Sequence, residues 1–214
     1  MPTMNYTETL KKYALAVPEI LLPAVKKDLS RWAVIACDQY TQDRSYWKRV
    51  SERAGDAPST VNLILPEVYL EDSGRAEKLQ SIRNTMDHYL GKNGSSGVFA
   101  DPVKGFVYIE RKTAYGRTRK GLVVAIDLDS YEWKPDSKAL IRATEATIVD
   151  RIPPRMEIRR GAPLESPHIM LLVNDPKKTL VEEAGKLARQ TLPLYETSLE
   201  PDSGSITGWE VSSP

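Results

Sequence analysis

Short apolar runs alternate with helical patterns along this chain, and this alternation constrains its fold more than any other feature. The clearest helical pattern runs from Arg75 to Leu90 and stops at Gly91. Its apolar side chains recur at helical spacing, at Leu79, Ile82, Met86, Tyr89 and Leu90. A short first helix is predicted around Leu10–Ala14, and a second between Asp43, as its N-cap, and Gly55. A last helix is predicted to begin with a capping box formed by Thr179 and Glu182.

The apolar runs predict strands. Trp32–Cys37, Thr60–Leu65 and His168–Asn174 read as buried strands, and residues 106–113 and 117–127 read as a β-hairpin whose tip is Ala-Tyr-Gly. We therefore expect an α+β fold, a mixed β-sheet with a β-hairpin and three to four helices packed on it. Residues 1–195 are predicted to form a single domain. Residues 196–214 are polar and turn-rich, which predicts a tail or a linker toward a second half that this chain lacks.

Composition excludes several classes of protein. Lys and Arg number 30 and Asp and Glu 29, so the net charge of +1 argues against nucleic acid as a general partner. The single cysteine, Cys37, cannot form an internal disulfide or a Cys-based zinc site, and no metal site is predicted. No apolar run is long enough to cross a bilayer, and the first residues lack the apolar core of a secretory signal. We expect a cytoplasmic protein without membrane contact.

An arginine-rich segment is the strongest candidate for a binding site. Five arginines lie between Arg142 and Arg160, interleaved with Glu145, Asp150 and Glu157. Arginine binds carboxylate and phosphate groups bidentately, so the segment predicts either an anion site or an internal ion-pair network. In the first case, Arg142, Arg151 or Arg155 holds the anion while Thr144 and Thr147 donate hydroxyl hydrogen bonds. In the second, Glu145, Asp150 and Glu157 neutralise the arginines. Pro153 and Pro154 are expected to exclude a helix around Ile152.

Two further residues join the predicted anion site. Asp38 follows the first predicted buried strand, where a site can form at the end of a sheet, but a turn-forming role explains it equally. His168 begins the last predicted strand and either faces a cleft or donates to a backbone carbonyl. Glu67 and Glu71 read as exposed charges at a strand end, and Cys37 as a buried, inert thiol.

The predicted hairpin also carries charge. Its basic residues surround Tyr115 and are Arg111, Lys112, Arg117, Arg119 and Lys120. A basic β-ribbon with an aromatic residue can bind nucleic acid. A charged hairpin edge that resists aggregation gives the same pattern, so both interpretations stay open.

Long motifs resemble a widespread bacterial family. They are L-L-P, W-A-V-I-A-C-D-Q-Y-T, G-D-A-P-S-T-V-N-L-I-L-P-E-V-Y-L, R-A-T-E-A-T-I-V-D-R-I-P-P-R and P-H-I-M-L-L-V-N-D-P, between about Pro18 and Gly208. The chain resembles the family catalogued as domain of unknown function ten-fifteen. The resemblance implies proteins about twice as long, whose second half has an Asp-Gly-His signature similar to that of the chromosome-partitioning and sulfiredoxin-like superfamily, which includes kinases. Neither His88 nor His168 follows an Asp-Gly. The chain is therefore expected to be an N-terminal half, inactive alone.

Two functions follow from these observations. The first is a domain that binds or phosphorylates a small anionic metabolite, and this is the one we favour. The second is a non-enzymatic module that binds protein or nucleic acid through the basic hairpin. Neither the residues nor the resemblance identifies a cofactor, a catalytic residue or an oligomeric state.

Overall fold

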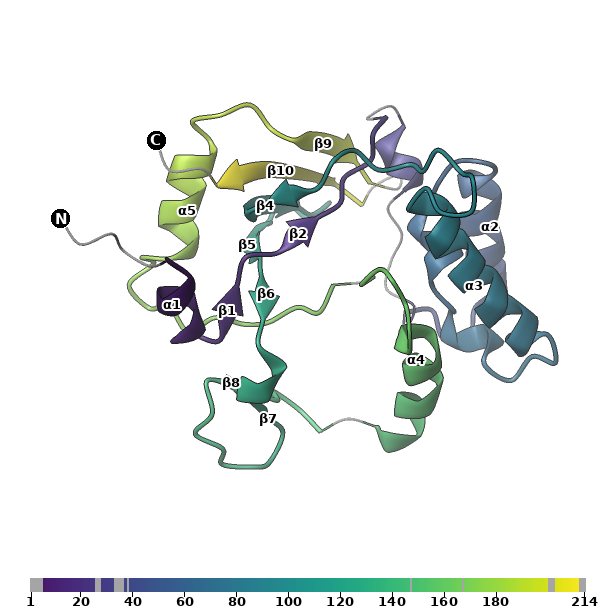
Figure 1. Cartoon of the computed structure of the whole chain (residues 1–214), viewed down its shortest axis with the longest axis horizontal. Coiled ribbons are helices and arrows are strands. Elements are labelled where there is room, and N and C mark those ends of the chain that lie inside the picture. The colour runs from purple at the N-terminus through teal and green to yellow at the C-terminus, as the bar shows by residue number, and fades with distance from the viewer. Residues whose placement is uncertain are drawn as a thin grey trace. The chain divides into compact units, whose positions relative to one another are not determined.

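The structure is a computed structural model that describes residues 6–25, 28–32, 37, 39–146, 148–166, 168–199 and 203–211. The chain divides into two compact units, which differs from the single domain expected over residues 1–195. Unit 1 comprises residues 1–21, 102–148 and 175–214, and unit 2 comprises residues 22–101 and 149–174. The elements combine helices with small, mostly antiparallel sheets, so the predicted α+β class is confirmed (Figure 1).

Unit 1 is built on a four-stranded antiparallel sheet. The strand order is β5 (Thr118–Val123), β4 (Phe106–Lys112), β10 (Ser205–Val211) and β9 (Tyr195–Ser198). The predicted hairpin is confirmed as β4 and β5, with Arg111 opposite Arg119. Helix α5 (Val181–Ala188) packs on one face of the sheet, where Gly185 lies against the ring of Tyr108 (Figure 1).

Short elements complete unit 1. Helix α1 (Tyr6–Lys11) precedes β1 (Leu15–Ala16), which pairs with β6 (Ala125–Ile126). Strand β2 (Glu19–Ile20) pairs with β3 (Val103–Lys104), and β7 (Tyr131–Glu132) pairs in parallel with β8 (Ile141–Arg142). A 3-10 turn, η4 (Leu128–Ser130), connects β6 to β7.

The expected polar tail over residues 196–214 is not what the structure has. Strand β10 is an inner strand of the sheet, and most of β9 also lies in this range. The glycines of this segment suggested turns, but Gly208 is buried in a strand because the ring of Tyr195 lies over it. Trp209 packs near Tyr108, with 5.9 Å between ring centroids. Tertiary packing therefore overrides the local turn signals.

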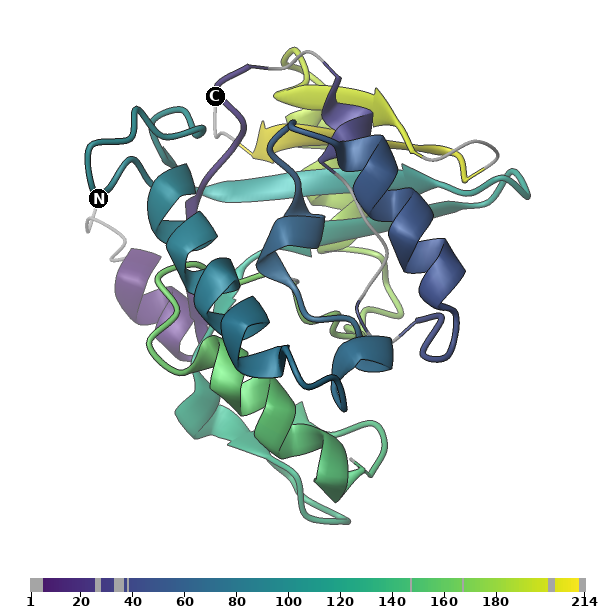
Figure 2. The ribbon, with the colours of Figure 1, turned by 90° about the vertical axis from the view of Figure 1, so that its right-hand side faces the viewer.

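Unit 2 consists of helices joined by 3-10 turns. Its helices are α2 (Arg44–Ala54), α3 (Arg75–Tyr89) and α4 (Ile152–Arg159), with turns η1 (Leu29–Arg31), η2 (Thr60–Leu63), η3 (Glu67–Tyr69) and η5 (Val149–Arg151) (Figure 2). Its core contains Leu63, Leu65, Ile82, Met86 and Tyr89, next to a second group of Trp47, Val50 and Ile64.

Local signals placed two of these helices correctly. The carboxylate of Asp43 accepts a hydrogen bond from the backbone N–H of Tyr46 at 2.9 Å, as an N-cap does. Helix α3 ends one residue before the predicted Leu90. The predicted strand Thr60–Leu65 is wrong, because its first four residues form η2. There the Ser59 N–H donates to the Tyr89 hydroxyl at 2.9 Å, a side chain distant in sequence.

Three other predictions are corrected. Helix α4 includes Pro153 and Pro154 in its first turn, where a proline needs no helical N–H partner. Residues 168–174 form no strand and are exposed, with Leu172 at 80%. Helix α5 begins at Val181 without a Thr179 cap, because the Asp175 carboxylate accepts hydrogen bonds from the Thr179 and Leu180 N–H groups instead. The predicted strand Trp32–Cys37 lies largely outside the described residues.

Candidate functional site

Two arginines of the arginine-rich segment bind one glutamate. Arg155 Nη2 lies 2.8 Å from Glu67 Oε1, and Arg151 Nη1 lies 3.6 Å from Glu67 Oε2. The Glu67 side chain is only 10% exposed, so the expectation of an exposed charge at a strand end is wrong. Arg151 and Arg155 are four residues apart across the start of α4, so they lie on neighbouring turns and reach the same carboxylate in η3.

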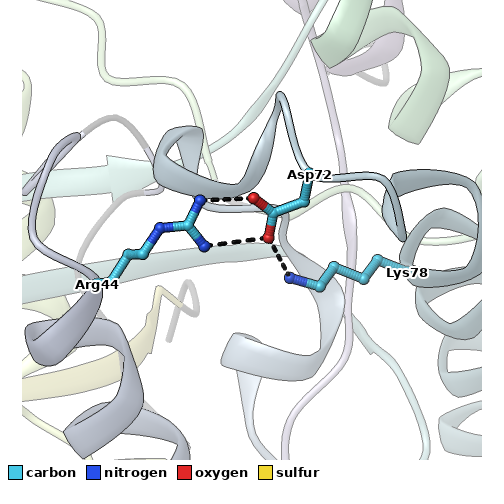
Figure 3. Close-up of polar contacts among 3 residues, drawn as sticks. All are labelled: Arg44, Asp72 and Lys78. Carbon is cyan, nitrogen blue, oxygen red and sulfur yellow. Dashed lines mark hydrogen bonds and ion pairs between the residues drawn. The ribbon is translucent and has the colours of Figure 1, made fainter.

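The carboxylate of Asp72, shortly after η3, likewise binds two cations. Arg44 donates two hydrogen bonds to Asp72, at 2.5 Å and 3.1 Å, and Lys78 Nζ lies 3.5 Å from Asp72 Oδ2 (Figure 3). The hydrogen bonds from Arg44 hold the pKa of Asp72 below its ordinary value and raise the pKa of Arg44. Lys78 Nζ also lies 3.7 Å from the centre of the Tyr69 ring, a cation–π contact.

We call these two acidic residues and the four cations that bind them the cationic cluster. They are Arg44, Glu67, Asp72, Lys78, Arg151 and Arg155. In each half, one guanidinium binds its carboxylate closely while a second cation is held more loosely. The loosely held cations are Arg151 and Lys78, whose distances of 3.6 Å and 3.5 Å exceed those of a strong charge-assisted hydrogen bond. Their side chains are 43% and 41% exposed, so they remain accessible from solvent.

An ion pair and a hydrogen bond connect helix α4 to α3. Arg75 binds Glu157 at 2.6 Å, and Arg83 donates to the Glu157 carbonyl at 2.9 Å. These contacts hold Arg151 and Arg155 in place beside η3. The internal ion-pair network expected as the alternative therefore exists in part. Of its three predicted acids, Glu157 binds an arginine of α3, while the arginines at 151 and 155 bind Glu67.

Three of the other predicted anion-site residues belong to unit 1. They are Arg142, Thr144 and Glu145, and all three are exposed, whereas Arg151 and Arg155 belong to unit 2. Arg142 donates a long hydrogen bond, 3.4 Å, to the Ser137 carbonyl. His168 belongs to unit 2 and is exposed. Asp38 and Thr147 lie outside the described residues.

Sequence reasoning missed Arg44, Glu67, Asp72 and Lys78. Glu67 and Arg155 are 88 residues apart, and Arg44 and Asp72 are 28 apart, so no local pattern joins them. The only available signal was the composition of the turn from Glu67 to Gly74, which places acids just before the basic start of α3.

Other features of unit 2 were searched for a site. An open depression is lined by Asn84, His88, Lys92, Asn93, Gly94 and Ser95. His88 lies ten residues beyond Lys78 on α3, about 15 Å along the helix, so this depression is separate from the cationic cluster. Cys37 is half-buried, not fully buried as expected. Within the described ranges, no three His, Cys, Asp or Glu side chains gather as metal ligands.

Residues 20–214 match the family described as "Protein of unknown function (DUF1015)". The chain belongs to this family. The match gives no support to the expectation that the chain is only an N-terminal half. No curated protein and no solved structure matches the chain. Among the described residues, no helix combines the length and the apolar character needed to cross a membrane.

Proposed function

We propose that unit 2 binds a small anionic metabolite, with a phosphate or carboxylate group, at the cationic cluster. The observation that carries this proposal is the loose second cation beside each carboxylate. Arg151 and Lys78 can turn toward a ligand while Arg155 and Arg44 keep Glu67 and Asp72 paired. A buried carboxylate left without a partner would be costly, so this division of roles lets a ligand bind without that penalty.

The charges of the cluster fit a phosphate group. Four cationic side chains share two carboxylates in the cluster, and Glu67 is nearly buried, where charge interactions are stronger than in water. Arg151 and Lys78, the two loosely held cations, would each offer a positive charge to a bound anion. The planar guanidinium of Arg151 supplies the paired donors that a phosphate or carboxylate accepts. The proposal concerns binding alone, and phosphoryl transfer stays a prediction from the family resemblance.

A thermal-shift screen tests the proposal. Phosphate, phosphorylated sugars, nucleotides and amino acids are each added to the full chain, and the melting temperature is measured. A true ligand at about 100 times its dissociation constant stabilises the fold by roughly 2.7 kcal/mol. Arg151→Gln removes one charge-assisted contact and should weaken that ligand's binding at least tenfold. Arg151 is the better choice than Arg155 because its pairing with Glu67 is longer, so its loss should disturb the fold less.

Lys48→Gln is the matched control. Lys48 is an exposed cation of α2 in the same unit, paired with Glu52 at 3.8 Å and outside the cluster. Its loss should leave ligand affinity unchanged. If no anion in the screen stabilises the wild-type chain, or if both variants weaken binding equally, the cluster is a structural ion-pair network and the proposal is wrong.

A further inference from the structure

Tyr40 presents an exposed aromatic ring on unit 2. This ring stacks on that of Tyr46 in α2, with 4.0 Å between the two ring centroids and 17° between the ring planes. The contact covers one face of the Tyr40 ring, yet Tyr40 is 51% exposed. The opposite face of the ring is therefore open to solvent. A flat surface of this kind can stack on a further flat ring.

The backbone of Tyr40 has a conformation that suits other residues better. Its φ is 49°, in the left-handed region, where glycine and asparagine are much more common than bulky residues. A turn at this position therefore does not by itself require a tyrosine. Unfavourable backbone conformations of this type concentrate at binding sites, where the side chain has a role that outweighs their cost. Stacking on Tyr46 uses one face of the ring, which leaves the second face for a ligand.

Tyr40 lies in the segment that joins the two halves of the cationic cluster. At one end of the segment, the Cys37 carbonyl accepts a hydrogen bond from the N–H of Glu67 at 3.1 Å. At the other end, Arg44 binds Asp72. Tyr40 is three residues from Cys37, so their Cα atoms are at most about 11 Å apart. The chain thus carries the exposed ring from one carboxylate of the cluster to the other.

Two hydrogen bonds hold Tyr40 beside the start of α2. The N–H of Asp43 donates to the Tyr40 carbonyl at 3.1 Å, and the indole N–H of Trp47 donates to the same carbonyl at 3.3 Å. The first bond closes a turn, which keeps the Cα atoms of Tyr40 and Asp43 within about 7 Å. Arg44 follows Asp43 directly, so the stacked ring and this arginine of the cluster belong to neighbouring parts of one turn.

The open ring and the loosely held cation are not adjacent. Along the chain of contacts, Arg44 and Asp72 separate Tyr40 from Lys78 (Figure 3). A ligand that reaches both therefore needs a flat ring at one end, an anionic group at the other and a spacer between them. A nucleotide has these three parts in its base, its phosphate and its sugar. A sugar phosphate lacks the ring, and a nucleoside lacks the charge.

We propose that the anion bound by the cationic cluster is a nucleotide, whose base stacks on the open face of Tyr40 while its phosphate binds Arg151 and Lys78. This inference rests on the anion site proposed above and names the class of its ligand. Stacking of a base on an aromatic side chain contributes mostly apolar contact, whereas the cluster contributes charge. The two contributions can therefore be removed separately.

Isothermal titration calorimetry on the full chain tests the inference, with ribose 5-phosphate and adenosine 5′-monophosphate as probes. Adenosine monophosphate should bind at least about fivefold more tightly, because only it has a base to stack. Tyr40→Asn removes the ring but suits the positive φ, so it should abolish this difference and leave the affinity for ribose 5-phosphate unchanged. Tyr40→Phe is the matched control, since it keeps the ring and should keep the difference.

The outcomes separate this inference from the anion site on which it rests. The nucleotide assignment is overturned if adenosine monophosphate binds no more tightly than ribose 5-phosphate, or if Tyr40→Asn weakens both ligands equally. It is also overturned if phenyllactate, an aromatic acid without a sugar, binds as tightly as adenosine monophosphate. In these cases the anion site stands if Arg151→Gln still weakens binding of ribose 5-phosphate. If neither probe binds the wild type, or if Arg151→Gln weakens neither, both proposals are wrong.

Discussion

At the scale of single residues, the carboxylate of Asp72 links three segments of unit 2. It binds Arg44 at the start of α2 and lies beside Lys78 of α3 (Figure 3). These contacts exist only when the carboxyl is ionised, which is why its pKa is lower in the folded protein than its ordinary value of 3.8. A group with a lowered folded pKa stabilises the fold fully above its unfolded pKa. That stabilisation is lost as the pH falls through the lower, folded value.

Asp72→Asn should therefore have a pH-dependent effect. At pH 7 the variant should unfold at a lower temperature than the wild type, because Arg44 and Lys78 lose their anionic partner. The difference should shrink as the pH falls below about 3.8, where the carboxyl of the unfolded chain takes up a proton, and should vanish once the pH lies below the lower pKa of the folded protein. Melting temperatures between pH 7 and pH 2.5 measure it. Glu52→Gln, which removes the exposed ion pair with Lys48, serves as the control and should change stability little. A difference that stays constant over this range would contradict the assignment.

Single residues allow only part of the candidate site to be predicted from the sequence. Residue type alone indicated that Arg151 and Arg155 would bind carboxylates, because the guanidinium group is suited to them. Their partner was not predictable, since Glu67 approaches only after η3 and α4 have packed together. Arg142 has the same residue type in the same segment of sequence, yet it belongs to the other unit. Proximity in sequence therefore grouped residues that belong to different compact units.

At the scale of elements, the contact between α5 and the sheet depends on a missing side chain. A Cβ at Gly185 would lie 2.6 Å from Cζ of Tyr108, whose ring is fully buried. Burial, followed by the hydrogen bond to Glu110, raises the pKa of Tyr108 to about 12, so its hydroxyl stays protonated and can donate to that carboxylate. The helix can approach the strand this closely only because residue 185 is glycine.

Gly185→Ala should destabilise the chain by about 1–3 kcal/mol, measured by urea unfolding. Alanine favours a helix over glycine by up to about 1 kcal/mol, so a purely local effect would have the opposite sign. Lys186→Ala, next to it on the exposed side of α5, removes only the surface pair with Glu183 and should change stability by less than about 0.5 kcal/mol. A neutral or stabilising Gly185→Ala would mean that the helix does not pack this closely.

The elements that were predictable are those whose signals are local. Helix α3 has an apolar stripe over four turns, α2 has its Asp43 cap, and the hairpin has two strands joined by a short turn. Helix α4 was not predicted, because prolines in the first turn of a helix resemble prolines that end one. The 3-10 turn η2 looks like a strand in sequence, and the backbone N–H of its N-cap, Ser59, donates to the hydroxyl of Tyr89, a residue far along the chain.

At the scale of the whole molecule, each unit has a core of its own. Met86 is 1% exposed in the core of unit 2, and Val107 is 1% exposed in unit 1. Met86→Ala should cost about 2–5 kcal/mol, and its effect should be concentrated in unit 2. Amide hydrogen exchange should then accelerate in α2 and α3 more than in β4 and β10. Val107→Ala should give the reverse pattern. Equal acceleration throughout the chain after either change would show that the two units unfold as one.

The path of the chain between its two units limits how the gene can be divided. Unit 2 is encoded in two stretches, residues 22–101 and 149–174, with part of unit 1 between them. A fragment ending at residue 101 would retain Glu67 but lack both of its arginines, and would leave Arg75 without Glu157. An expression plasmid for unit 2 alone would therefore need a designed splice from residue 101 to residue 149.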